Sequence, residues 1–122
     1  MHDHTAIIER YIVCWNETDA NRRRTLVEEI WTESATYVDP LMQGAGHDGI
    51  YAMIDAVQKQ FPGFQFSLTG PVHSLAVHAR FSWRLAPEGA AALVEGTDFA
   101  IIAADGRLES VTGFLDRVPA AA

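Results

Sequence analysis

The stretch from Ser34 to Gly44 holds a carboxylate in a setting that favours acid–base chemistry. β-Favouring and apolar residues at 35–38 predict a short strand, and the strand stops at Asp39-Pro40. These apolar neighbours predict that Asp39 points into the protein. A carboxyl held against apolar walls has its neutral form favoured, which makes it a better base. The competing interpretation is structural, because Asp-Pro commonly opens a turn.

Other reactive residues do not form recognisable sites. Cys14 lies in the middle of an expected helix with no matching base, and a buried free cysteine is usually inert. The histidines lack the spacing of a ligand motif; they are His2, His4, His47, His73 and His78. Gly44-Ala45-Gly46 lacks the lysine of a phosphate-binding loop. We therefore expect neither a metal ion nor a cofactor.

Three helices are expected to position Asp39, at residues 5–17, 20–31 and about 49–61. The first carries an apolar stripe at helical spacing, made of Ile8, Tyr11, Ile12 and Trp15. Asp19 and Asp48 are the expected caps of the second and third helices. Acidic neighbours place the Arg22–Arg24 run on the solvent-facing side of the second helix. Gln43 to Gly46 is expected to be a flexible loop.

After residue 63 the apolar period changes from helical spacing to strict alternation, which predicts strands. The expected strands are 64–68, 77–85, 91–103 and 107–116, with a hairpin turn at Asp105-Gly106. Helices followed by hairpin-linked strands predict an α+β fold with a curved antiparallel sheet. Gly70, Gly96 and Gly113 favour that curvature. Three N-terminal helices across the concave side would form a cone with an internal cavity.

Length and composition restrict the function further. The chain has 122 residues, which fits one domain spanning 1–122 with its core at about 6–117. A net charge of −7 argues against nucleic acid and against anionic membrane surfaces as partners. No apolar run reaches membrane-spanning length, and no signal peptide is visible. With a single cysteine, the expected location is the cytoplasm.

Several short motifs occur in an order that resembles the nuclear-transport-factor-two-like superfamily. They are Tyr11 with Trp15-Asn16, the run Ala35 to Pro40, Arg80-Phe81-Ser82-Trp83, Glu95 to Phe99, Asp105 to Leu108, and the closing Val111 to Asp116. The closing motif resembles the SnoaL-like branch, which stands beside the ketosteroid isomerases in this superfamily. The resemblance covers about residues 6–117 and implies a small cone-shaped α+β domain of the cystatin-like kind.

The resemblance also implies roles for particular residues. Asp39 matches the general base of the ketosteroid isomerases, Tyr11 their hydrogen-bonding tyrosine, and Asp98 their protonated aspartic acid. The expected pocket-lining residues are Trp15, Phe81, Trp83, Val111 and Leu115. Asp116 is the rival acid–base residue, as in the cyclase branch. The epoxide-hydrolase chemistry of the superfamily is not expected, because Gly96 stands where those enzymes carry an arginine.

Two functional hypotheses follow. The first is a small isomerase or cyclase that binds a hydrophobic carbonyl compound and moves a proton with Asp39 as base, while Tyr11 and Asp98 stabilise the enolate. The second is a non-catalytic domain that binds a small hydrophobic ligand or serves as an accessory module. A homodimer through the outer sheet face bearing Arg80 and Arg84 is compatible with both. Alternation in strand 77–85 leaves open whether the side of His78 or the side of Phe81 lines the cavity.

Overall fold

The computed structural model describes residues 3–118 as three helices and one sheet. The helices are α1 (Thr5–Asn16), α2 (Ala20–Ile30) and α3 (Gly46–Gln60). The strands are β1 (Trp31–Val38), β2 (Gln43–Ala45), β3 (Phe64–Leu68), β4 (His73–Leu75), β5 (His78–Pro87), β6 (Val94–Ile102) and β7 (Leu108–Arg117). This confirms the expected α+β class. No helix in the described part of the chain is long and apolar enough to cross a membrane.

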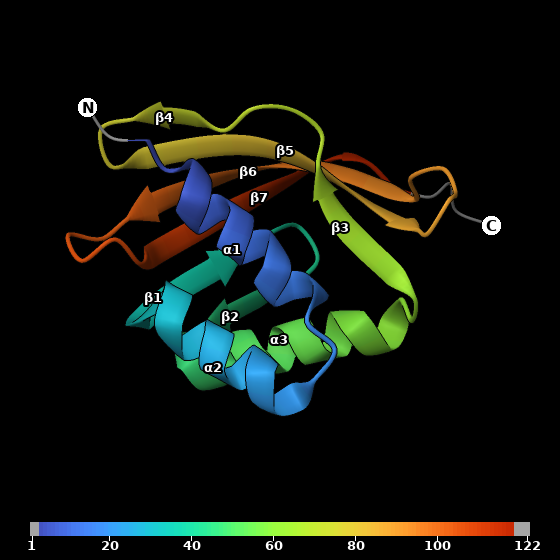
Figure 1. Ribbon diagram of the computed structural model, residues 1–122, viewed down its shortest axis with the longest axis horizontal. Helices are drawn as coiled ribbons and strands as arrows, with labels where there is room; N and C mark the ends of the chain where they lie inside the picture. Colours follow the sequence, from blue (N-terminus) through green and yellow to red (C-terminus); the bar gives the residue numbers. More distant parts are fainter. Residues whose placement is uncertain (1–2, 119–122) are drawn as a thin grey trace.

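The strands form one curved sheet in the order β2-β1-β7-β6-β5-β3, with β4 also pairing with β5 (Figure 1). The strands after α3 pair antiparallel, as expected. The sheet as a whole is mixed, because β1 runs parallel to β7. A parallel neighbour requires a long connection, and the chain between β1 and β7 supplies one. A shift of register at Glu95/Gly96 lies in the β6–β7 pair, consistent with the curvature predicted from Gly96.

Alternation along β5 separates the two faces of the sheet. Ala79, Phe81, Trp83 and Leu85 are buried, whereas Arg80 and Arg84 are exposed. The side bearing Phe81 therefore faces the helices. His78 lies on the outer face, where its ring stacks on Phe99 with the centroids 5.3 Å apart. The homodimer across this outer face stays a prediction.

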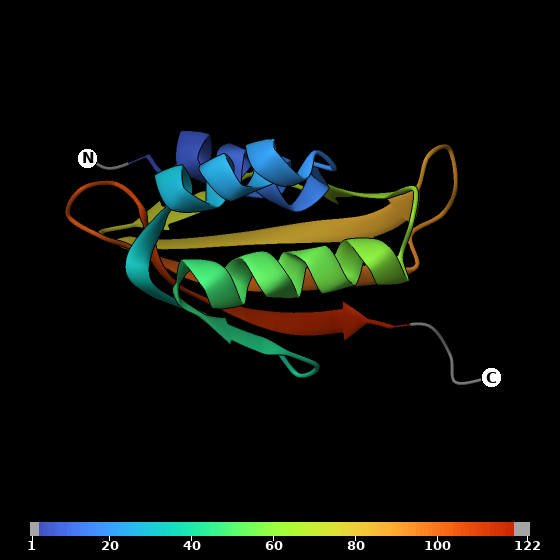
Figure 2. The same ribbon diagram turned by 90° about the horizontal axis from the view of Figure 1, so that it is seen from below.

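The helices cover the concave face of the sheet unevenly. Helix α3 packs on β1 and β2 at one edge, and α1 packs on β3 at the other edge. Helix α2 packs against both helices, and Figure 2 shows it beside α1. Side chains from β5, β6 and β7, in the middle of the sheet, line a cavity together with side chains from α1 and α3.

Two expectations for the start of α3 were wrong. Gln43–Ala45 is a strand rather than a flexible loop, because it pairs antiparallel with Thr36–Val38 of β1. The chain then turns into α3 at Gly46, whose φ of +71° suits a residue without a side chain. Asp48 does not cap the helix; it lies in the first turn and accepts a hydrogen bond of 2.6 Å from Arg24.

The arginine run of α2 was also assigned too simply. Arg24 is partly exposed, but Arg23 is 2% exposed and lies between α2 and α3. Its guanidinium forms an ion pair of 2.8 Å with Asp55 and donates to Gln58 at 2.9 Å. It also donates to the backbone carbonyl of Glu17. A buried charge persists only with such partners, so Arg23 ties α3 to α2 and to the loop before it.

Candidate active site

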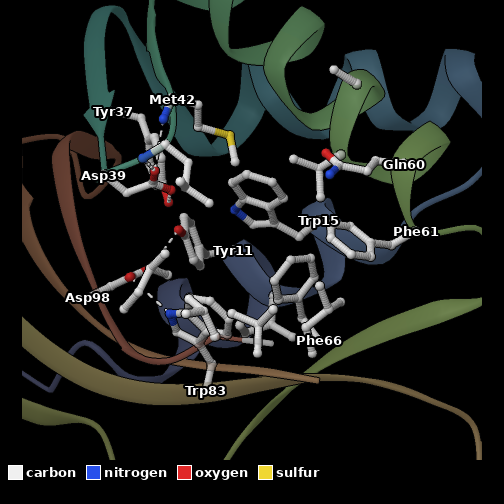
Figure 3. Close-up of a pocket in the computed structure, with 18 residues that line it drawn as sticks. Tyr11, Trp15, Tyr37, Asp39, Met42, Gln60, Phe61, Phe66, Trp83 and Asp98 are labelled. Carbon is white, nitrogen blue, oxygen red and sulfur yellow. Dashed lines mark hydrogen bonds between the residues drawn. The ribbon is translucent and has the colours of Figure 1, made fainter. Parts of the chain in front are cut away.

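A cavity of about 700 Å³ opens between the helices and the middle of the sheet. Six residues expected to act or bind there line it, namely Tyr11, Trp15, Asp39, Trp83, Asp98 and Leu115 (Figure 3). The rest of the lining is mostly apolar and includes Phe61, Phe66, Leu85 and Val94. Leu41 and Val118 also line the cavity and are 75% and 52% exposed, so they mark its mouth. The volume is in the usual range for a small-molecule pocket.

Asp98, in the middle of β6, is 1% exposed and held by two side chains. The Tyr11 hydroxyl donates to its Oδ2 at 2.8 Å, and the Trp83 indole Nε1 donates to its Oδ1 at 2.9 Å. Tyr11 comes from α1 and Trp83 from β5, the neighbour of β6. Asp98 therefore joins the helical layer to the sheet at the inner end of the cavity.

Burial raises the pKa of Asp98 to about 6, against the lowering effect of the hydrogen bonds from Trp83 and Tyr11. The charges of Asp39 and Asp116 raise it further. Burial, followed by the charge of Asp98, raises the pKa of Tyr11 well above its ordinary value, so that hydroxyl keeps its proton. Within the Tyr11–Asp98 pair, it is therefore the carboxyl of Asp98 that gains or loses a proton, at about pH 6, while Tyr11 keeps its own.

Asp39 follows the end of β1 and is held mainly by its own turn. Its Oδ1 accepts from the backbone N–H groups of Leu41 at 2.8 Å and Met42 at 3.0 Å. Its Oδ2 accepts from the Tyr37 hydroxyl at 2.6 Å. One oxygen of Asp39 therefore closes a turn, while the side chain also lines the cavity. A carboxylate has about four acceptor positions, so Oδ2 retains one for a ligand.

Two glycines leave the space that the carboxylates need. A Cβ at Gly96 would lie 2.4 Å from Cζ2 of Trp83, so the missing side chain lets the indole lie flat over β6 and reach Asp98. A Cβ at Gly113 would lie 2.9 Å from Oδ1 of Asp98 and 3.2 Å from Cβ of Asp39. Gly113, the partner of Asp98 in β7, thus lies between the two carboxylates and shows that they share one end of the cavity.

Some expected site residues lie elsewhere. Phe81 and Val111 are each 1% exposed and lie in the core rather than on the cavity wall. Phe81 packs on Tyr11 with ring centroids 5.4 Å apart, so it supports the site from behind. Asp116, the rival acid–base residue, is exposed and accepts from Thr97 at 2.7 Å on the outer face.

Tyr37 is the main residue that sequence reasoning missed. It lies two residues before Asp39, and residues two apart on a strand share a face, so the spacing was a usable signal. Burial, followed by the charge of Asp98 and its bond to Asp39, raises the pKa of Tyr37 above its ordinary value. Its hydroxyl therefore stays a donor to Asp39.

The described residues contain no group of three or more His, Cys, Asp or Glu side chains arranged to hold a metal ion. Burial raises the pKa of Cys14 to about 12, so its thiol is not a nucleophile at neutral pH. The polar groups that line the cavity are the carboxyls of Asp39 and Asp98, the hydroxyls of Tyr11 and Tyr37, the indoles of Trp15 and Trp83, and the amide of Gln60.

The profile of the SnoaL-like domain matches residues 8–111. No curated protein matches the chain. A candidate isomerase of the SnoaL-like family from Agrobacterium tumefaciens has 45% identity and a TM-score of 0.89, covering 93% of this chain and 97% of its own.

Two more distant structures share the fold at 16% identity. One is a protein with a ketosteroid isomerase-like fold from Catenulispora acidiphila, in complex with trimethylamine, with a TM-score of 0.71 over 88% of this chain and 82% of its own. The other is a candidate SnoaL-like polyketide cyclase from Jannaschia, with a TM-score of 0.69 over 90% of this chain and 85% of its own. The match over most of its length and the 45% identity establish that this chain belongs to the SnoaL-like domain family.

Proposed function

We propose that this protein is a cofactor-independent isomerase or cyclase that moves a proton within a hydrophobic carbonyl compound. The observation that carries the proposal is the pairing of Asp39 and Asp98 at one end of an otherwise apolar cavity. Two carboxyl groups in different environments can take different proton-transfer roles. The apolar walls select a hydrophobic substrate, and the few polar groups fix its orientation.

Asp39 is the general base in this proposal. Its turn and Tyr37 hold the carboxylate in place, and Oδ2 keeps an acceptor position for the proton removed from the carbon next to the carbonyl. The same group then returns the proton to another carbon, which completes an isomerisation. Alternatively, the enolate carbon attacks a second carbonyl of the same molecule and the proton passes from Asp39 to the alkoxide that forms, which completes a cyclisation. A positioned base of this kind contributes roughly 10²–10⁴-fold to a rate.

Tyr11 stabilises the enolate oxygen, and Asp98 controls whether it can. When Asp98 is ionised, the Tyr11 hydrogen is donated to Asp98 and is not available to the substrate. When Asp98 is protonated, its own O–H can donate to the Tyr11 oxygen and release the Tyr11 hydrogen toward the cavity. Asp98 thus acts through Tyr11 as a positioning residue, since Tyr11 and Trp83 already engage both of its oxygens.

The comparisons support the proposal without naming a substrate. The relative at 45% identity is a candidate isomerase, and one of the distant structures is a candidate cyclase. An isomerisation or a cyclisation that begins with proton removal next to a carbonyl is compatible with one base and one oxyanion donor.

The test is deuterium uptake by a hydrophobic cyclic ketone in heavy water, which detects proton removal whatever product the natural reaction forms. Asp39→Asn is expected to lower the enzyme-dependent uptake roughly 10²–10⁴-fold. Asp116→Asn carries the same chemical change on the outer face and is expected to retain uptake. Undiminished uptake in Asp39→Asn, or its loss in Asp116→Asn, would contradict the proposal.

A non-catalytic ligand-binding domain is the second candidate, and the turn around Asp39 favours it. Three of the four acceptor positions of that carboxylate are occupied by groups of the chain itself, which is what a purely structural aspartate requires. A ketone that binds tightly and takes up no deuterium would support this candidate.

A further inference from the structure

The wall of the cavity combines aromatic rings with negative charge. The rings that line it are those of Tyr11, Trp15, Tyr37, Phe61, Phe66 and Trp83. Trp15 packs on Tyr37 and Phe66, with ring centroids 5.7 and 5.2 Å apart. Phe66 in turn packs on Trp83 at 5.3 Å. Among the described residues that line the cavity, none is Lys, Arg or His. Every formal charge on this wall therefore belongs to a carboxyl group.

The two carboxyl groups on the wall have neutral hydrogen-bond partners. Asp39 accepts from a hydroxyl and two backbone N–H groups, and Asp98 accepts from a hydroxyl and an indole. Within residues 3–118, neither forms an ion pair. By contrast, arginines pair with three aspartates outside the cavity, Asp48, Asp55 and Asp105. When both cavity carboxyls are ionised, their negative charges are therefore not compensated by the chain.

Buried charge of this kind is normally compensated. Arg23, which is 2% exposed, forms an ion pair of 2.8 Å with Asp55. Asp98 is 1% exposed and is ionised above about pH 6, yet it has no such partner in the described chain. Charges attract each other several times more strongly in a protein interior than in water. A positive charge on a ligand in the cavity would supply the compensation that Asp98 does not receive from the chain.

The aromatic rings favour the same kind of ligand. A cation near the face of an aromatic ring is attracted by the negative charge density of that face, and sites lined by several rings recognise ammonium groups. Figure 3 shows Asp39 and Asp98 on one side of the cavity and Phe61 and Phe66 on the other. This arrangement fits a ligand with a cationic group at one end and an apolar body at the other.

We infer that the cavity binds an organic cation, a protonated or quaternary amine attached to an apolar body, with its positive charge near Asp39 and Asp98. The inference rests on the proposed function only for the carbonyl group that the same ligand would carry, because recognition of the charge requires no reaction. Transfer of a proton from the ligand to Asp39 neutralises that carboxylate and forms an enolate, so the total charge in the cavity does not change. The ammonium therefore offsets one negative charge before and after this step, whether Asp98 is ionised or protonated.

The test compares phenyltrimethylammonium with tert-butylbenzene, which has the same shape and no charge. Tryptophan fluorescence reports binding, because Trp15 and Trp83 line the cavity. At pH 8 the cation is expected to bind about tenfold or more tightly than the neutral probe, although the neutral probe is the more hydrophobic of the two. Benzoate, an aromatic ring with a negative charge, is expected to bind more weakly than both. Equal or tighter binding of tert-butylbenzene or of benzoate overturns the inference.

A second readout uses the unaltered chain and so does not depend on the folding of a variant. A cation near Asp98 stabilises its ionised form, so phenyltrimethylammonium should lower the pKa of Asp98, measured from its carboxyl carbon signal, and tert-butylbenzene should not. The groups of the chain that act on Asp98 are the same with either probe, namely Tyr11, Trp83, Asp39 and Asp116. An unchanged pKa of Asp98 with the cation bound would contradict the position inferred for the charge.

Variants then separate charge from shape. Asp98→Asn keeps the size of the side chain and removes its charge, so it should weaken phenyltrimethylammonium binding about tenfold and change tert-butylbenzene binding by less than about twofold. Asp39→Asn removes the other charge and should act in the same direction. Asp116→Asn, the matched change on the outer face, should alter neither. Equal losses for both probes in Asp98→Asn and Asp39→Asn would show that the shape of the cavity, and not its charge, selects the ligand.

These results are separable from the proposed function. If deuterium uptake depends on Asp39 but phenyltrimethylammonium binds no better than tert-butylbenzene, the inference fails and the proton-transfer function stands. If the cation is preferred but no ketone takes up deuterium, the inference stands for a binding domain and the catalytic proposal fails.

Discussion

The two carboxylates of the cavity are held in opposite ways. Asp39 lies at the end of β1, half-buried, and two of its three hydrogen bonds come from the backbone of its own turn. Asp98 lies in the middle of β6, fully buried, and both of its hydrogen bonds come from side chains on other elements. A backbone turn keeps its geometry when neighbouring side chains change, whereas a side-chain network does not.

The two carboxylates therefore depend on different parts of the structure, Asp39 for its position and Asp98 for its pKa. Asp39 is positioned locally, so its location depends on few residues outside β1 and the turn. Asp98 depends on Tyr11, on Trp83 and on the absence of a side chain at Gly96, and its burial raises its pKa to about 6. Mutations around Asp98 should therefore change stability and its pH dependence, whereas mutations around Asp39 should change deuterium uptake.

The largest effect is expected when the charge of Asp98 is removed. Its pKa is raised from the ordinary 3.8 to about 6, so the folded state binds this proton more tightly than the unfolded state does. The protonated carboxyl therefore contributes stability that is fully present below pH 3.8 and is lost as the pH rises through about 6. Asp98→Asn keeps an acceptor for Trp83 and a donor for Tyr11 without the charge. Its unfolding free energy relative to wild type should therefore rise by roughly 2 kcal/mol between pH 4 and pH 7.

Urea unfolding at several pH values measures this difference. Asp98→Ala is the matched variant, because it removes the same charge but leaves Tyr11 and Trp83 without a partner and should be destabilised at every pH. A constant difference between Asp98→Asn and wild type across this pH range would show that burial does not set the proton affinity of Asp98.

A smaller effect is expected when the space beneath Trp83 is filled. In Gly96→Ala the new Cβ would meet the indole and, at 2.8 Å, the backbone carbonyl of Phe114. Overpacking of this kind destabilises by about 1–3 kcal/mol, and the Trp83–Asp98 bond should weaken with it. Thermal unfolding and the indole signal of Trp83 measure the two consequences.

Gly70→Ala is the control for Gly96→Ala. A Cβ at Gly70 meets no atom within 4 Å and its backbone does not require glycine, so stability should be unchanged or rise by roughly 0.4–1 kcal/mol. Equal stability in the two variants would mean that Trp83 can move aside freely. The hydrogen bond between Trp83 and Asp98 would then not depend on the glycine at position 96.

The smallest effect is expected when a hydrogen bond to Asp39 is removed. Tyr37→Phe removes the 2.6 Å hydrogen bond to Oδ2 but leaves both backbone donors, so Asp39 should stay in place. Deuterium uptake is expected to change by no more than about tenfold, the equivalent of one hydrogen bond. Tyr51→Phe removes a hydroxyl outside the cavity and should leave uptake unchanged; a far larger loss in Tyr37→Phe would show that Asp39 is not held by its turn.

Periodicity predicted the elements well because most strands have one wet and one dry face. Strand 77–85 alternates so regularly that β5 was located to within two residues at either end. Two short strands, β2 and β4, were missed. Three residues are too few to establish a period, and both are strands only because a longer neighbour supplies hydrogen bonds.

The site was only partly predictable for a similar reason. Asp39 was singled out from its own stretch of sequence, Tyr11 and Asp98 from the resemblance to the ketosteroid isomerases, and the structure brings all three to one cavity. Whether Phe81 and Val111 line the cavity or lie in the core depends on which part of the buried face is covered by a helix. Alternation shows only that a residue faces inward, not what covers it. Arg23 was placed in solvent because of its charged neighbours, although its spacing from Val27 and Ile30 puts it on the buried stripe of α2.

The bare backbone at Gly96 has an evolutionary consequence. The indole of Trp83 occupies the volume that a side chain at position 96 would fill, so the two positions form one steric unit. Relatives that retain tryptophan at the first position should retain glycine at the second, and relatives with a smaller residue at the first should tolerate larger ones at the second. Such a covarying pair would identify the family members in which a tryptophan can donate to the carboxyl group in the middle of β6. It would also identify those in which other side chains fill that end of the cavity.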